Sequence, residues 1–156
     1  MNTRSIHEIQ QELKNLDKKE IIEHALRLGK FKKENKELLS YLLFESEDEK
    51  SFVKSVKETI DMMFLEINMS SVYYIKKTLR KILRYTNRCI KYSGIKQTEI
   101  ELRIYYLQKI RVAKIPVTSS VMLSNLYNRE AEKIKNIFTK LHEDLQFDYK
   151  EDVEKL

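Results

Sequence analysis

Glycine and proline are almost absent from this chain, and their scarcity limits the folds that it can adopt. Only two glycines and one proline occur among 156 residues. Tight hairpins, phosphate-binding loops and strained catalytic turns depend on glycine, which adopts positive φ angles at little cost. Lys, Leu, Glu and Ile dominate instead, and this composition is typical of helical proteins. The composition therefore predicts an all-α protein and argues against sheets and glycine-rich active sites.

Helix start signals divide the chain into short segments. Ser5 with Glu8, and Asp17 with Glu20, form two capping boxes in which each side chain satisfies a backbone N–H of the other residue. The remaining start and stop signals lie at Ser46, Ser70 or Ser71, Gly94, Thr98, Pro116, and Ser119 or Ser120. Apolar residues follow each start at helical spacing. The pattern predicts about six mostly antiparallel helices with short connections, forming either an irregular α-α superhelix or a compact helical bundle.

The length of the chain fits one domain. We expect a single helical domain over residues 1–146, followed by a charged and frayed tail over residues 147–156. The segment from Ile100 to Ile110 is apolar on most sides, so it should form the most buried helix. Within it, Tyr105 and Tyr106 could belong either to the core or to a dimer surface.

The location of the protein is predicted from what the sequence lacks. No stretch approaches the 18 apolar residues of a membrane span, and the first twelve residues have no apolar signal core. The single Cys89 allows no internal disulfide, which suits a reducing compartment. We therefore expect a cytoplasmic protein without a membrane partner.

Positive charge is concentrated in the middle of the chain. Residues 69–115 carry twelve Lys and Arg against two Asp and Glu, a net charge of +10, whereas residues 1–68 and 116–156 each carry −2. A helix over residues 72–93 would present an apolar face, a cationic face roughly opposite, and tyrosines along one boundary. Its candidate binding residues are Lys77, Arg80, Lys81, Arg84, Arg88, Lys91, Tyr74, Tyr85 and Tyr92.

This arrangement of cations and rings has the chemistry that a nucleic acid requires. Lys and Arg bind backbone phosphates, and neighbouring aromatic rings stack on bases. An acidic protein would be bound equally well, and many helices carry Lys and Arg simply as a solvated face. The helix over residues 72–93 contains no acid to offset repulsion between like charges four residues apart. The pattern therefore favours a partner without identifying it.

Catalytic chemistry finds little support in the sequence. His7, His24 and His142 are not preceded by Glu three residues earlier, so the Glu-x-x-His pairs of helical di-iron sites are missing. Cys89 lies on the apolar face of its helix, where a structural thiol is expected rather than a nucleophile. No nucleotide-binding, zinc-protease or nucleophile-elbow motif occurs. We predict no catalytic residue, no metal ligand and no cofactor.

Two resemblances to known proteins rest on particular stretches. Residues 13–22, which read LKNLDKKEII, resemble the short helix, acidic cap and longer helix of SAP-type DNA-binding modules, but lack their internal glycine. More of the chain is similar to a group of small, functionally uncharacterised bacterial all-helical proteins. That likeness is carried by residues 16–45, 78–83, 92–94 and 141–145. It implies a self-contained helical domain and supplies no site residues.

The sequence thus leads to one primary expectation and one alternative. We expect a non-enzymatic cytosolic helical domain that binds a protein partner through exposed helix faces. The alternative is nucleic-acid binding through the basic helix over residues 72–93. The identity of the partner and the oligomeric state stay open.

Overall fold

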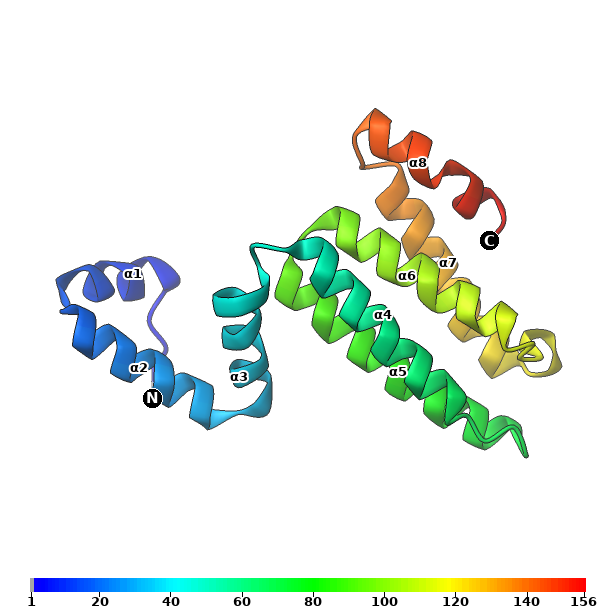
Figure 1. Cartoon of the computed structure of the whole chain (residues 1–156), viewed down its shortest axis with the longest axis horizontal. Coiled ribbons are helices and arrows are strands. Elements are labelled where there is room, and N and C mark those ends of the chain that lie inside the picture. Colours follow the sequence, from blue (N-terminus) through cyan, green and yellow to red (C-terminus); the bar gives the residue numbers. More distant parts are fainter. Residues whose placement is uncertain (1) are drawn as a thin grey trace. The chain divides into compact units, whose positions relative to one another are not determined.

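A computed structural model describes residues 2–156, and in this part of the chain every regular element is helical (Figure 1). Helices account for 81% of the residues, there are no strands in this range, and eight α-helices form where about six were predicted. The all-α prediction is confirmed. The chain divides into two compact units, Met1–Phe44 and Glu45–Leu156, whereas the sequence predicted one domain over residues 1–146. The division falls beside an acidic stretch in which the Asp48 carboxylate caps a new helix.

The N-terminal unit contains α1 (Ile6–Asn15), α2 (Lys18–Phe31) and α3 (Lys33–Ser40). Both predicted capping boxes are present. The Ser5 hydroxyl accepts the Glu8 N–H at 3.2 Å, and the Ser5 N–H donates to the Glu8 carboxylate at 2.9 Å. Asp17 and Glu20 exchange equivalent bonds of 2.8 and 3.0 Å. Local chemistry readable from the sequence therefore fixes where α1 and α2 begin.

The joint between α2 and α3 is a single extended residue, Lys32. The Asn35 side-chain amide donates to the Leu28 carbonyl at 2.9 Å, which satisfies a carbonyl near the end of α2. Gly29 lies within α2 and does not end it. A Cβ atom at this position would lie 2.8 Å from Leu39 Cδ1, so the missing side chain lets α3 approach α2 closely. A π-helical turn, Tyr41–Glu45, follows α3.

The C-terminal unit consists of five helices: α4 (Glu49–Leu65), α5 (Val72–Ser93), α6 (Lys96–Val112), α7 (Val121–Phe138) and α8 (Glu143–Glu154). A 3₁₀ turn, Val117–Ser119, precedes α7. Successive helices from α4 to α7 reverse direction, as predicted (Figure 1). α6 packs against α4, α5, α7 and α8, so it is the common element of the unit.

The interior of this unit is built around α6, as its apolar sequence predicted. Ile100, Leu102 and Leu107 have no exposed surface. Tyr106 is equally buried, and its hydroxyl donates to the Leu79 carbonyl at 3.1 Å, so Tyr106 belongs to the core. Thr98, predicted to cap α6, lies inside the helix with its hydroxyl donating to the Glu49 carboxylate.

The end of the chain differs from the expected frayed tail. α7 stops at Phe138, and α8 begins at Glu143 after the capping residue His142, whose Nδ1 accepts the Asp144 N–H at 3.4 Å. Val153 of α8 is buried, and Asp152 accepts a hydrogen bond from Gln108 of α6 at 2.9 Å. A mostly charged segment is therefore held in place by one buried apolar side chain and by polar contacts with α6, while its Phe147 stays exposed. No helix among residues 2–156 has both the length and the apolar character needed to cross a bilayer.

Candidate functional site

The outer side of α5 is the surface that the sequence singled out. The Ser71 hydroxyl caps its first turn, and Gly94, at φ 68°, ends it in the left-handed conformation that glycine adopts without strain. Ile75, Leu79 and Ile82 are buried on the inner side. The 22 residues of α5 form a rod about 33 Å long. Residues three and four positions apart share its outer side.

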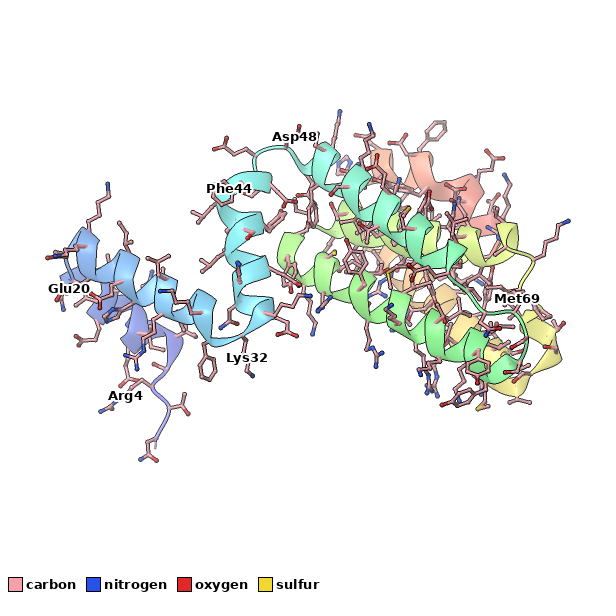
Figure 2. The ribbon with its side chains drawn as sticks, turned by 60° about the horizontal axis from the view of Figure 1, so that its bottom comes forward. Arg4, Glu20, Lys32, Phe44, Asp48 and Met69 are labelled. Carbon is pink, nitrogen blue, oxygen red and sulfur yellow. The ribbon has the colours of Figure 1, made fainter. Side chains whose placement is uncertain are left out.

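Five of the six predicted cations are exposed on this side, and we call them the basic face. They are Lys77, Arg80, Lys81, Arg84 and Lys91. None of them takes part in an ion pair within residues 2–156. Figure 2 shows nitrogen-tipped side chains projecting from the outer side of α5, drawn in green. The basic face is therefore open to solvent over most of the helix.

Three cations that lie between helices of the same unit are paired with carboxylates. Lys57 on α4 lies 2.6 Å from Glu101, and Lys109 on α6 lies 2.8 Å from Asp61. Arg103 on α6 pairs with two acids. The fold thus brings carboxylates to these cations between its helices, whereas the basic face lies on a segment, residues 67–98, that contains no acid of its own.

The other four predicted residues, one on the cationic side and three tyrosines along its boundary, divide into two groups. Arg88, Tyr85 and Tyr92 are half-buried, so they are less accessible to a ligand than predicted. Tyr74 is 46% exposed. Its neighbour Tyr73, which was not among the predicted residues, is 67% exposed, and the two ring centroids lie 5.4 Å apart in an edge-to-face arrangement. Tyr73 could have been identified from the sequence, because two adjacent tyrosines follow the serine that caps the first turn of α5.

A buried charge network joins α6 to α7 beneath this surface, and the sequence did not predict it. Glu130 of α7 is only 1% exposed. One carboxylate oxygen lies 2.6 Å from Arg103 Nη1, and the other lies 2.6 Å from Lys133 Nζ. Arg103 also donates to Glu99 from Nε and Nη2, at 2.9 and 2.8 Å. Both oxygens of Glu130 are therefore fully engaged, as a buried carboxylate requires.

Tyr105 lies at the polar edge of the contact between α4 and α6. Its hydroxyl donates to the Asp61 carboxylate at 2.7 Å, and the ammonium groups of Lys57 and Lys109 lie 5.1 and 5.6 Å from its ring centroid. Burial raises the pKa of Tyr105 to about 12, and the Asp61 carboxylate adds to the effect. This hydroxyl therefore stays protonated at neutral pH and serves packing rather than proton transfer.

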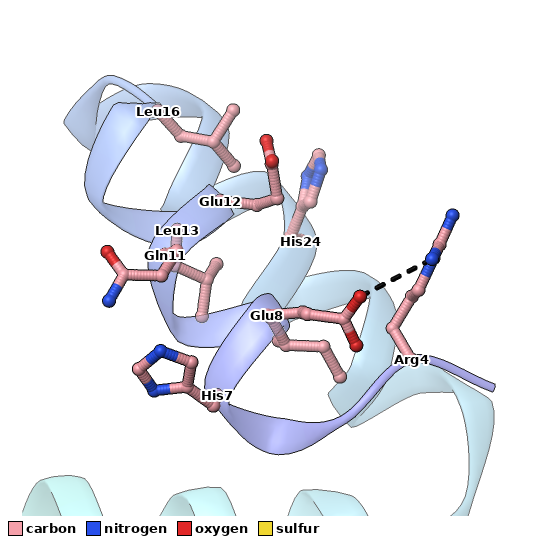
Figure 3. A pocket seen from close by; sticks show the side chains of 9 residues that line it. Arg4, His7, Glu8, Gln11, Glu12, Leu13, Leu16 and His24 are labelled. Carbon is pink, nitrogen blue, oxygen red and sulfur yellow. Dashed lines mark hydrogen bonds and ion pairs between the residues drawn. The ribbon is translucent and has the colours of Figure 1, made fainter.

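A cavity of about 690 Å³ lies between α1 and α2 in the N-terminal unit (Figure 3). Leu13 and Leu16 are among its apolar walls, and His7 and His24 come to it from different helices. Glu8, at its edge, is bonded within the capping box and pairs with Arg4 at 3.3 Å. The hydrogen bond from the Ser5 N–H holds the pKa of Glu8 below its ordinary value. This carboxylate is therefore ionised and engaged, which does not suit a general acid or base.

The chemistry for a metal centre or a reactive thiol is not assembled in the part of the chain that the structure describes. No group of three His, Cys, Asp or Glu residues in that range could hold a metal ion. Cys89 is 5% exposed on the inner side of α5, as predicted.

Comparison with known proteins adds no family to these observations. No family model, curated protein or solved structure matches the chain.

Proposed function

We propose that this chain is a non-enzymatic binding domain that recognises nucleic acid through the basic face of α5. The observation that carries the proposal is the row of five exposed cations without ion pairs. From Lys77 to Lys91 the row extends about 21 Å along the helix axis, which corresponds to about six phosphates along one strand of a duplex. A cytoplasmic location belongs to the same proposal and is supported by the sequence, whose single cysteine allows no internal disulfide.

The basic face destabilises α5 through repulsion between like charges, and this destabilisation supports a role in binding. Lys77 and Lys81, and Arg80 and Arg84, are like-charged pairs four residues apart on one helix. Each such pair destabilises a helix by about 0.2–0.5 kcal/mol. A bound polyanion would turn this repulsion into attraction and release counterions. Tyr73 and Tyr74 offer rings for stacking at one end of the row.

The test is the salt dependence of binding to a labelled single-stranded oligonucleotide, measured by fluorescence anisotropy. Five phosphate contacts predict a slope of about −3.5 in a plot of log K against log salt concentration. Lys81→Glu should lower the affinity and make the slope shallower, because it removes one contact and repels another phosphate. It should also stabilise α5 slightly, since the new carboxylate would lie four residues from Lys77 and replace a repulsion by an attraction.

The matched control is Lys54→Glu, which makes the same charge change at an exposed position of α4. Equal losses of affinity in the two variants would mean that net charge, rather than the basic face, determines binding. Absence of binding by the wild-type protein at low salt would remove the proposal. A thermal melt of each variant separates loss of binding from loss of fold.

A protein partner, the primary expectation from the sequence, is the second candidate and is favoured by the N-terminal unit. No residue within α1, α2 or α3 is buried. A groove of about 560 Å³ between α2 and α3 has apolar walls that include Leu26, Leu39 and Phe44. Four lysines also line this groove: Lys30, Lys32, Lys33 and Lys36. An amphipathic helix with an acidic polar side would match both its apolar walls and its charge.

This second candidate predicts that an acidic amphipathic peptide shifts NMR signals of α2 and α3. A scrambled peptide of the same composition, with its apolar side broken, should have much weaker effects. Lys33→Glu should reduce the shifts from the first peptide. Equal shifts from both peptides would indicate charge attraction alone and would exclude docking in the groove.

A further inference from the structure

A cleft beside the basic face lies between α5 and α7, which both pack against α6. It has a volume of about 320 Å³, at the lower end of the range for small-molecule sites. Its lining residues are Arg80, Leu83, Met122, Asn125, Leu126, Arg129, Glu130 and Lys133. The cleft therefore combines apolar side chains with three cations and one carboxylate.

The carboxylate of the cleft is already neutralised. Glu130 is buried, and its two oxygens are held by Arg103 and Lys133 at 2.6 Å each. Arg80 and Arg129 are exposed and form no ion pair within residues 2–156. Two guanidinium groups are thus left for an incoming anion. A planar guanidinium binds phosphate through paired hydrogen bonds and can also stack on a base.

The apolar lining of the cleft indicates that the bound anion is part of a larger ligand with an apolar surface. Leu83 and Leu126 offer apolar surface, and the Asn125 amide supplies both donors and an acceptor for the edge of a base. A simple inorganic anion would leave that surface unused. A nucleotide, with a flat ring and one phosphate, matches the apolar lining, the amide and the guanidinium groups together.

Arg80 links the cleft to the basic face, because it belongs to both. A strand bound along α5 would therefore pass the mouth of the cleft. In a single strand an unstacked base can be turned out into a pocket, whereas the bases of a duplex are paired and stacked. The occupant of the cleft must then come from an unpaired region.

We infer that the cleft between α5 and α7 binds one unpaired nucleotide of the strand held by the basic face, which makes the protein selective for single-stranded nucleic acid. This inference rests on the proposed function. It assigns the backbone phosphates to the basic face, the phosphate of the inserted nucleotide to Arg80 and Arg129, and its base to the apolar lining and Asn125.

The test compares three labelled probes by fluorescence anisotropy: oligothymidine, its duplex with oligodeoxyadenosine, and an abasic strand of the same length. Arg129→Gln should weaken binding to oligothymidine about tenfold, the usual size for losing a hydrogen bond between charged groups. Its affinity for the duplex should change less than about twofold, because the duplex does not enter the cleft. The wild-type protein should bind the abasic strand about tenfold more weakly than oligothymidine.

Lys135→Gln, at an exposed position of α7 outside the cleft, is the matched control and should leave all three affinities within about twofold. If Arg129→Gln lost affinity equally for the single strand and the duplex, the inference would be overturned. It would also be overturned if the wild type bound the abasic strand as tightly as oligothymidine. Either result leaves the basic face as the binding surface. If the wild type binds none of the probes, the proposed function itself fails.

Discussion

Replacing Arg103 by Met tests whether the buried charge network holds α6 and α7 together. The substitution keeps an unbranched side chain but removes the ion pair with Glu130 and two hydrogen bonds to Glu99. Removing one partner of a buried pair costs about 3–5 kcal/mol, because the other charge stays buried. Lys133 still holds Glu130, and the Glu99 side chain is 29% exposed, so we expect the lower end, about 3 kcal/mol.

Urea denaturation followed by circular dichroism measures this loss as a change in midpoint at constant slope. In a thermal melt, about 3 kcal/mol corresponds to a decrease of about 6–12 °C for a chain of this size. The double variant Arg103→Met, Glu130→Met should recover most of the loss, because apolar side chains replace a buried pair with little net cost.

Lys133→Met is the control, because its side chain is 51% exposed and its contribution should stay below about 1 kcal/mol. If Arg103→Met cost less than Lys133→Met, the buried pair would not stabilise the contact. If the loss of unfolding free energy in the double variant equalled the sum of the losses in Arg103→Met and Glu130→Met, the two residues would act independently. The destabilisation by an uncompensated buried charge would then be refuted.

Two further predictions concern stability. Burial raises the pKa of Tyr105 and of Tyr149 to about 12, so these groups stabilise the fold fully below pH 10 and lose that contribution as the pH rises towards 12. The urea midpoint of the wild type should fall between pH 10 and pH 12, and it should fall less in Tyr105→Phe. A midpoint that does not change with pH would contradict the raised pKa of these tyrosines. Gly94→Ala should destabilise the protein by about 1–2 kcal/mol, because alanine is strained at φ 68°. Gly94→Asn should lose less stability than Gly94→Ala. Equal urea midpoints for the wild type and Gly94→Ala would show that this turn tolerates a side chain.

Local signals in the sequence predicted much of the helical architecture. The caps at Ser5, Asp17 and Ser71 and the stop at Gly94 act through residues at most four positions away, so they can be found without knowing the fold. The burial of α6 followed from its apolar residues on most sides. These features depend on interactions within one helix or on composition alone.

The missed features depend on contacts between distant segments. The Arg103–Glu130 pair joins residues 27 positions apart, and the cleft exists only because α5 and α7 flank α6. The start of α8 was missed because His142 is an uncommon cap. For the basic face, the sequence predicted which cations share a side of α5. Their exposure depended on where the acids of α4, α6 and α7 would lie, and Asp61, Glu101 and Glu130 pair with cations outside the basic face.

The central place of α6 separates the residues that hold the C-terminal unit together from those that face solvent on the outer side of α5. Side chains on all sides of α6 pack against neighbouring helices, so a substitution in α6 disturbs several packing contacts at once. The outer side of α5 supports no neighbour, and its residues can change without refolding the unit. The solvent-facing positions of α5 can therefore change in descendants of this chain, while the scaffold beneath them stays the same.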